Sequence, residues 1–307
     1  MHLLTIDMDG SIAAQESLPD VAAWTTVDQL DLRDLGPRLR LWSRAGTIRE
    51  ARDRIAALPN DEPALHLLGS GDFHHLAVLL IERAREPVTV IHIDNHPDWV
   101  RLAPRWHCGS WVNQALRLAQ VKRVVTLGVC SDDLVRPDLK GGNLAALSAG
   151  RIVMLPWNRA PSRVWHRVVE GFGHHYSDGY LHWRNLAQDG IAKNLAGIVG
   201  QIQTDAIWLS IDKDVLPQAD AITNWDQGQM PLDAVLELIA QVGARKRIIG
   251  ADICGEYSPP RHRNWFKRFE ARHDQPQFDL PDAVPLERNE RTNRRLLATI
   301  EQATRAC

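Results

Sequence analysis

The chain has 307 residues, a formal net charge of −2, and a hydrophobic fraction of 44%. This near-neutral charge excludes the basic footprint of a nucleic-acid-binding protein, and no run of about 18 apolar residues predicts a membrane span. A wide α/β sheet can fill this length, so we expect one domain over residues 1–307. The cysteines are scattered, and the first residues carry neither a basic region nor a cleavage signal, so we expect a cytoplasmic protein.

Apolar runs separated by turn residues predict strands that alternate with helices along the chain. The predicted strands lie near residues 2–7, 64–69, 88–93, 122–129, 151–155, 205–211 and 246–253. The predicted helices lie near residues 74–85, 109–120, 231–242 and 286–304. This alternation predicts a three-layer α/β/α sandwich with a mostly parallel central sheet. Residues 158–195 and 258–285 lack the pattern, and we expect them to be loop insertions.

Three polar clusters follow three of the predicted strands, within residues 69–75, 91–98 and 209–214. They contain two imidazoles and four carboxylates, from His74, Asp94, His96, Asp98, Asp212 and Asp214. Ligands of open α/β sheets gather beyond the carboxyl ends of strands, and residues i, i+2 and i+4 of an extended chain point to one side. The set suits two adjacent divalent ions, and its mixture of carboxylates with imidazoles favours manganese.

These clusters resemble the motifs of the arginase and agmatinase family, the ureohydrolases, and the resemblance covers residues 60–260. The second and third motifs of that family, Asp-x-His-x-Asp and Ser-x-Asp-x-Asp, stand at residues 94–98 and 210–214. The first motif departs because Phe73 is inserted, and aligning Leu76 and Ala77 makes His74 the ligand and His75 its neighbour. The resemblance implies the arginase-like fold, two Mn²⁺ ions per chain, and hydrolysis of a guanidino group with release of urea.

The resemblance also implies a role for each site residue. Asp94 and Asp212 would bridge the two ions, with His74 and Asp98 completing one ion and His96 and Asp214 the other. Asp98 would relay the proton of the attacking water. His107 resembles the shuttle histidine that follows the second motif, and Glu256 matches the glutamate that pairs with the substrate guanidinium. We therefore expect Asp98, His107 and Glu256 to be catalytic.

The segment 99–106 differs from the Asn- and Ser-rich loop that grips the amino-acid head in free-arginine arginases. It is bulky and basic, and it makes Trp99, Arg101 and Arg105 candidate substrate-binding residues, with either arginine able to bind a carboxylate or a peptide carbonyl. The chain also has 11 tryptophans. Several of them fall in or near predicted loops, which predicts an aromatic rim for a large substrate. These departures resemble peptide arginases, which convert arginine side chains of ribosomally made precursor peptides to ornithine.

Other functions stay open at this point. Hydrolysis of another guanidino or formimino compound, as in agmatinase or formiminoglutamase, fits the same metal ligands. Asp7 and Asp9 resemble the first motif of haloacid-dehalogenase-like phosphatases, although no matching lysine stands out, and both carboxylates also suit a turn that bonds backbone amides. A non-catalytic metal-binding homologue is the remaining alternative. The sequence does not fix the oligomeric state, and a homo-oligomer is compatible with it.

Overall fold

The computed structural model describes residues 2–15, 26–60, 63–102, 104–259, 262, 264–276, 281 and 283–305. An eight-stranded sheet forms its centre, with strand order β2-β1-β3-β11-β10-β4-β5-β6 and every pairing parallel. The strands are β1 (His2–Asp7), β2 (Thr26–Asp31), β3 (Ala64–Leu67), β4 (Val88–Ile93), β5 (Val121–Leu127), β6 (Ile152–Leu155), β10 (Ala206–Asp212) and β11 (Arg247–Cys254).

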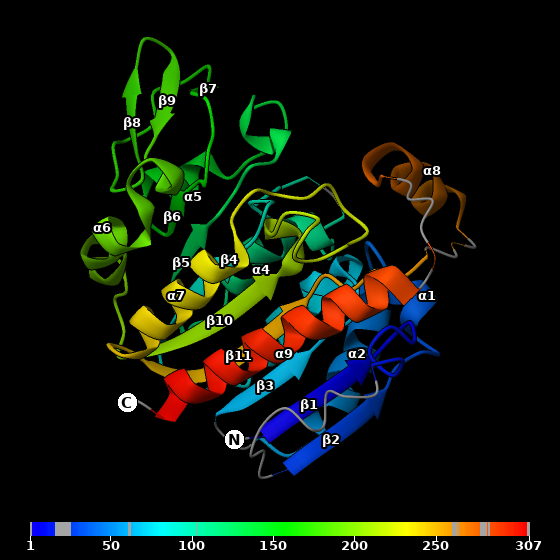
Figure 1. Ribbon diagram of the computed structural model, residues 1–307. Coiled ribbons are helices and arrows are strands. Elements are labelled where there is room, and N and C mark those ends of the chain that lie inside the picture. The colour runs from blue at the N-terminus through cyan, green and yellow to red at the C-terminus, as the bar shows by residue number, and fades with distance from the viewer. Residues whose placement is uncertain are drawn as a thin grey trace.

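Helices cover both faces of this sheet (Figure 1). The described helices are α1 (Gly36–Leu39), α2 (Ala45–Ala56), α3 (Ala77–Ile81), α4 (Trp111–Ala115), α5 (Leu144–Ser148), α6 (Leu186–Gly200), α7 (Leu232–Gly243), α8 (Trp265–Asp274) and α9 (Ala283–Arg305). Alternate strand residues point to opposite faces, so Leu4 belongs to the core cluster shared with α2, α3 and α4, whereas Leu3 belongs to the cluster shared with α6, α7 and α9. The predicted three-layer α/β/α sandwich is confirmed.

The strand order places the three polar clusters at one edge of the sheet. The chain crosses from β3 to β4 and leaves room between them, which β10 and β11 fill later in the sequence. The carboxyl ends of β3, β11, β10 and β4 are therefore neighbours. The clusters continue from three of these ends into short 3₁₀ turns, at Gly71–Leu76 after β3 and at Lys213–Val215 after β10, and into an irregular segment after β4.

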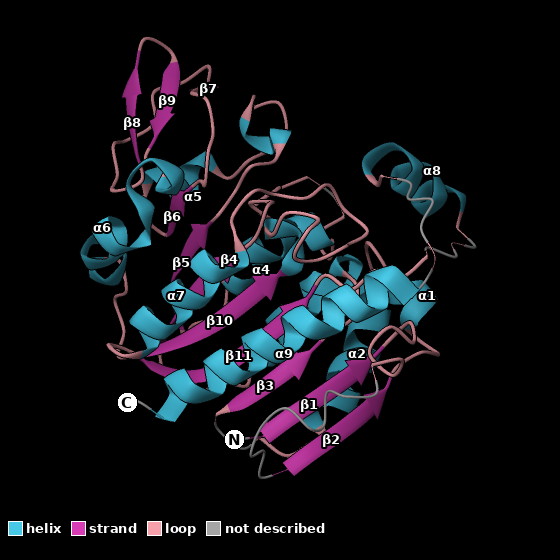
Figure 2. Cartoon of the chain, in the orientation of Figure 1, coloured by secondary structure: helices cyan, strands magenta, loops and turns pink. Residues whose placement is uncertain are grey.

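The prediction that residues 158–195 form a loop insertion was wrong. They contain a three-stranded antiparallel sheet of β7 (Ser162–Arg163), β8 (His174–Ser177) and β9 (Tyr180–Trp183), which projects beyond the β6 edge (Figure 2). Asp178 and Gly179 have φ values of 51° and 82°, which is the two-residue hairpin turn that an Asp-Gly pair favours. This turn signal was present in the sequence.

The second predicted insertion, residues 258–285, contains helix α8. The Asn264 side chain accepts hydrogen bonds from the amides of Phe266 and Lys267, which caps the start of this helix. The Lys267 ammonium donates to the carbonyls of Arg38 and Arg40, at 3.1 and 2.6 Å, so the helix is attached to the end of α1. Among the described helices, none combines the length and the apolar character that crossing a membrane requires.

Candidate metal-dependent active site

His74 lies at the centre of the predicted ligand set. Its Nδ1 atom is 3.1 Å from Asp94 Oδ2, 3.2 Å from Asp98 Oδ2 and 3.7 Å from Asp212 Oδ2. These residues come from the ends of β3, β4 and β10, so the structure brings together three segments that are far apart in the sequence. His75 points elsewhere, with its Nε2 atom 3.0 Å from the Ser43 hydroxyl.

A buried hydrogen-bond chain sets the tautomer of His74. Trp208 Nε1 donates to Asp252 Oδ2 at 2.6 Å, and the Ser210 hydroxyl donates to Asp252 Oδ1 at 2.8 Å. Since Ser210 has given its only proton to Asp252, its oxygen must accept from His74 Nε2, which lies 2.9 Å away. The proton of the imidazole is therefore on Nε2. The Nδ1 lone pair is left facing the carboxylates without a hydrogen-bond partner.

A second ligand group adjoins the first and shares Asp94 with it. His96 Nδ1 is 2.9 Å from Asp214 Oδ2 and 3.7 Å from Asp94 Oδ1. His96 Nε2 is 2.8 Å from Asp226 Oδ1, so Asp226 orients this imidazole from the outer side. All six predicted ligands therefore belong to adjoining, overlapping groups of possible metal ligands.

Two further residues belong to these groups, and the sequence analysis missed them. His92 Nε2 lies 2.8 Å from Asp94 Oδ2, and the Cys254 thiol donates to Asp212 Oδ2 at 3.1 Å. Their side chains complete the two sets of possible ligand atoms that contain His74. A signal for His92 existed, because it stands two residues before Asp94 and so points to the same side of the strand.

Asp98 has a strained backbone, with a φ of 46° that non-glycine residues rarely adopt. Its carboxylate accepts a hydrogen bond from Trp111 Nε1 at 2.7 Å, which fixes it toward His74. Strand β4 ends at Ile93, so the extended-chain explanation for residues 94–98 was incomplete. The left-handed turn at Asp98 is what returns its carboxylate to the cluster, and such strain is typical of functional sites.

The charge of the cluster supports cation binding. Burial raises the pKa of Asp212 to about 7, with the nearby Asp214 carboxylate adding to the effect. Burial likewise raises the pKa of Asp214 to about 8, with a further contribution from Asp94. Four buried carboxylates and an imidazole with an unpartnered lone pair form a donor set that divalent cations satisfy. The residues present therefore fit the two ions that the fold implies.

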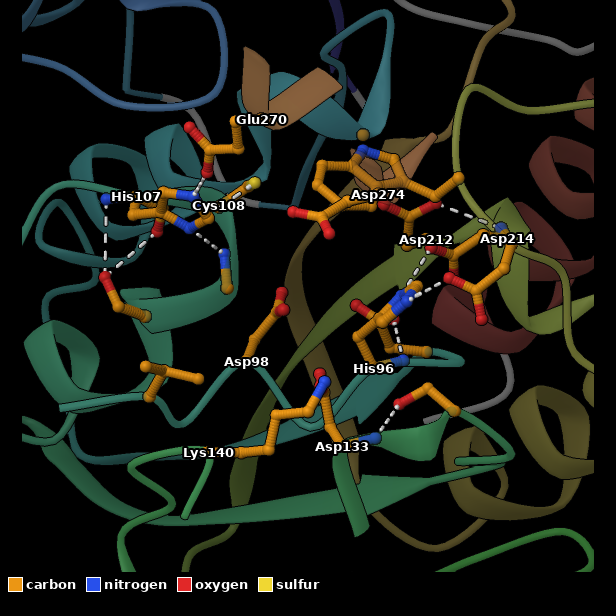
Figure 3. Close-up of a pocket in the computed structure, with 18 of the residues that line it drawn as sticks. His96, Asp98, His107, Cys108, Asp133, Lys140, Asp212, Asp214, Glu270 and Asp274 are labelled. Atoms are coloured by element: carbon orange, nitrogen blue, oxygen red, sulfur yellow. Dashed lines mark hydrogen bonds and ion pairs between the residues drawn. The ribbon is translucent and has the colours of Figure 1, made fainter. Parts of the chain in front are cut away.

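The cluster forms the floor of a cavity of about 650 Å³. Figure 3 shows His96, Asp98, Asp212 and Asp214 on this floor, with His107 and Glu270 at one end of the cavity and Asp133 and Lys140 at another. Lys140 is the only lysine or arginine among the described lining residues, whereas carboxylates are abundant. The cavity therefore attracts cations.

His107 lines this cavity, and its ring nitrogens bond to Glu270 and to the Gly109 amide, not to the proposed metal ligands. The Gly109 amide donates to His107 Nδ1 at 2.9 Å, so the proton of the neutral ring is on Nε2 and is donated to Glu270 Oε1 at 2.5 Å. Glu270 comes from α8 and also accepts from Trp42 Nε1 at 3.1 Å. Sequence analysis missed Glu270 because nothing in its own segment indicates that it returns to the site.

The structure does not bring Glu256 into the cavity. Its buried carboxylate forms an ion pair with the Lys213 ammonium and accepts a hydrogen bond from Asn293 Nδ2 at 2.7 Å. Lys213 is completely buried, and burial lowers the pKa of its ammonium, an effect that Glu256 partly offsets. Glu256, the residue expected to pair with a guanidinium, is therefore engaged within the core by Lys213 and Asn293.

The predicted aromatic rim was wrong, because the tryptophans predicted to form it do not line the cavity. Trp99 and Trp111 are completely buried core residues, and Trp183 is only 8% exposed. Trp165 is exposed but does not line the cavity among the described residues. Trp225 does line it, close to His96, and it was not predicted because the loop that carries it has no recognisable pattern.

Arg101 and Arg105 also lie outside the catalytic cavity, and both line a separate cavity next to it. At the other side of the site, Asp7 accepts hydrogen bonds from the amides of Asp9 and Gly10, as in the turn interpretation. Asp9 forms a buried ion pair with Arg40 at 2.7 Å. Asp7 and Asp9 therefore have structural roles, in a turn and in a buried ion pair.

The chain is therefore a three-layer α/β/α sandwich with a cluster of possible metal ligands at the carboxyl ends of its central strands. No protein-family model matches the chain. An uncharacterized protein of Thermotoga maritima is 28% identical over 211 residues, which cover 67% of this chain and 65% of that protein. The match thus spans just under two thirds of the relative's length.

Solved structures resemble the chain over nearly its whole length. Proclavaminate amidino hydrolase from Streptomyces clavuligerus has a TM-score of 0.62 and 15% identity, covering 100% of this chain and 92% of its own. Arginase from Bacillus caldovelox has a TM-score of 0.61 and 14% identity, covering 97% of each chain. Formimidoylglutamase from Bacillus subtilis has a TM-score of 0.60 and 13% identity, covering 97% of this chain and 87% of its own. The chain therefore has the arginase fold, as the ureohydrolase resemblance implied.

Proposed function

We propose that this protein is a manganese-dependent hydrolase that cleaves a guanidino group and releases urea. The observation that carries the proposal is the convergence of His74 Nδ1 with the carboxylates of Asp94, Asp98 and Asp212 on the floor of an acidic cavity. Two ions bound there would lower the pKa of a water molecule so that it attacks the guanidinium carbon at neutral pH. His74, Asp98, Asp94 and Asp212 would hold one ion.

His96 and Asp214 would hold the second ion, together with the bridging carboxylates of Asp94 and Asp212. Asp226 and the Ser210 hydroxyl support the two imidazoles from behind. Such outer contacts keep a ligand in its metal-binding orientation. The proposal of two ions rests on this division into two adjoining groups, and manganese is proposed because imidazole and carboxylate ligands are mixed.

The guanidinium of the substrate stays charged near neutral pH and requires a carboxylate. Glu256 is occupied by Lys213, so we assign this role to Asp274. Asp274 lines the cavity from α8, and its carboxylate forms no ion pair within 4.0 Å in the described part of the chain. A fork-shaped contact with this carboxylate would hold the guanidinium above the cluster.

Breakdown of the tetrahedral intermediate expels an amine, which must gain a proton. Asp98 receives a proton from the attacking water, and His107 with Glu270 forms the route by which protons reach or leave the cavity. Glu270 is partly exposed, with 24% of its side chain accessible, so its carboxylate exchanges protons with solvent. The His107 imidazole lines the cavity and also donates a hydrogen bond to the Glu270 carboxylate, so it connects the two.

The substrate we propose is an arginine side chain within a peptide, which would yield ornithine. The cavity of about 650 Å³ is large for a free amino acid, and Val100, Leu102 and Pro104 line part of its wall. The second candidate is a small guanidino or formimino compound, and it is favoured by the similarity to formimidoylglutamase and to an agmatine ureohydrolase structure from Thermoplasma volcanium.

The test compares urea release from arginine, agmatine and a capped arginine peptide at equal manganese loading. We expect the highest kcat/KM for the peptide and loss of activity on chelation. Asp274→Asn should raise KM while metal content stays at the wild-type value. Preference for agmatine would remove the peptide substrate but keep the reaction. Phosphatase activity that depends on Asp7 and not on Asp94 would overturn the proposal.

A further inference from the structure

A second cavity, of about 380 Å³, adjoins the catalytic cavity. The two share Val100, Leu102 and Ser110 as lining residues, so they lie next to each other on the surface of the protein. The lining of the second cavity is basic, whereas the lining of the first is acidic. Its charged lining consists of four arginines, Arg101, Arg105, Arg117 and Arg151, and no aspartate or glutamate lines it among the described residues.

These four guanidinium groups lack counter-charges of their own. Within the described part of the chain, no carboxylate forms an ion pair within 4.0 Å of any of them. Arg151 is fixed in place, because its guanidinium donates to the carbonyls of Leu116 at 2.9 Å and Lys122 at 3.0 Å. Like charges that line one concavity repel each other, and an anionic ligand offsets this cost.

The wall between the two cavities is held by neutral side chains. Asn113 Nδ2 donates to the Val100 carbonyl at 2.9 Å, and Asn143 Nδ2 donates to Asn113 Oδ1 at 2.7 Å. The backbone amide of Arg101 donates to the Gly141 carbonyl at 2.9 Å. These bonds attach the segment that carries Arg101 to α4 and to the turn before α5, so the basic cavity has a defined wall.

We propose that the basic cavity binds aspartate or glutamate side chains that neighbour the target arginine in a substrate peptide. The inference rests on the proposed function and narrows its substrate class. The acidic cavity receives the guanidinium, and the adjoining basic cavity receives carboxylates of the same chain through fork-shaped contacts with arginine. A peptide with acidic residues next to the target arginine presents both charges to the two cavities, whereas agmatine presents no carboxylate.

Binding of a peptide that cannot react tests the proposal separately from catalysis. The probe is a capped peptide of four aspartates with an uncharged dye, and its counterpart of four asparagines is the control ligand. The double variant Arg101→Gln with Arg105→Gln should weaken binding of the acidic probe about tenfold, which corresponds to ~1.4 kcal/mol. Arg49→Gln, which removes an exposed arginine on α2, is the matched control and should leave binding unchanged.

Added salt should weaken the same interaction, because the guanidinium groups are exposed. Equal affinity for the two peptides, or equal weakening by Arg49→Gln, would overturn the proposal. Displacement of the probe by inorganic phosphate at concentrations below those of the peptide would also overturn it and would identify a small-anion site. If the acidic probe binds as expected but no guanidino compound releases urea, the proposed function fails while the anion subsite stands.

The kinetic arm compares two capped peptides that share one arginine, followed either by two aspartates or by two asparagines. We expect the acidic peptide to have the lower KM in the wild type, with similar kcat for both. The double arginine variant should remove this difference and leave the asparagine peptide unaffected. An acidic peptide that retains its advantage in the variant would contradict the assignment.

Discussion

Replacing Asp252 by asparagine should weaken metal binding although Asp252 is not a proposed ligand. In the wild type, Asp252 accepts hydrogen bonds from both Trp208 and Ser210. Asparagine has only one acceptor oxygen, and the Trp208 indole can only donate, so that oxygen must face Trp208. The amide nitrogen then donates to Ser210, which turns its own proton toward His74 Nε2. The imidazole proton moves to Nδ1, where it blocks the metal-binding lone pair.

The size of the effect follows from one buried hydrogen bond. To bind metal, the variant must return the proton to His74 Nε2 and leave the Ser210 hydroxyl proton without an acceptor. An unsatisfied buried donor costs about 1–3 kcal/mol. This corresponds to roughly a 5- to 150-fold loss of affinity, in the range seen when outer partners of metal ligands are removed. We therefore expect a clear loss at one site without unfolding.

Titration of metal-free protein with manganese, followed by calorimetry, measures this loss. Trp208→Phe is the control, because it removes a bond to the same carboxylate but leaves the direction of the relay unchanged. The double variant Trp208→Phe with Asp252→Asn should recover affinity, since the asparagine oxygen can then turn toward Ser210. Thermal unfolding of the metal-free proteins checks that each one folds. Wild-type affinity in Asp252→Asn, or no recovery in the double variant, would refute the tautomer mechanism.

Three further predictions concern the cluster and the ion pair behind it. Asp94→Ala should lose both ions by elemental analysis, because Asp94 belongs to both ligand groups, and retention of one full ion would contradict its bridging role. His74→Ala should lower the metal content, whereas His75→Ala should leave it near wild type, and the opposite result would show that the first motif is misaligned. Lys213→Ala should lower the free energy of unfolding by about 3–5 kcal/mol, because it leaves Glu256 buried and unpaired. Denaturant unfolding measures this loss, and a change below about 1 kcal/mol, the scale of an exposed pair, would contradict it.

The clustering of most of the proposed metal ligands was predictable because it depends on a local rule. A polar residue directly after a buried strand must lie at the sheet edge, and the parallel topology then brings such edges together. The places of Asp94 and Asp212 followed from this rule without any knowledge of strand order, whereas the choice of His74 over His75 came from aligning Leu76 and Ala77 with the ureohydrolase motif. The local rule did not predict the left-handed turn at Asp98. That turn is explained by the packing of Trp111, whose indole donates a hydrogen bond to the Asp98 carboxylate.

The walls of the cavity were not predictable in the same way. Glu270 reaches His107 because Lys267 attaches α8 to the end of α1, a contact between segments more than 200 residues apart that no local pattern signals. Trp99 illustrates the opposite error, because its neighbours in sequence are loop residues and yet its side chain is fully buried. Position in a loop does not determine which way a side chain points, and the direction decides whether it forms part of the site.

Lys213 shows how one residue inside an intact motif can change the chemistry around it. Asp212 and Asp214 face the cluster, whereas Lys213, the first residue of the 3₁₀ turn between β10 and Leu216, points into the core toward Glu256. An apolar side chain there would leave Glu256 without a charged partner, and burial would then favour turning its carboxylate toward any available cation. With Lys213 in place, the two charges satisfy each other within the core, together with Asn293. Under the proposed function, binding of a guanidinium would therefore depend on the carboxylates that α8 contributes to the cavity wall, Glu270 and Asp274.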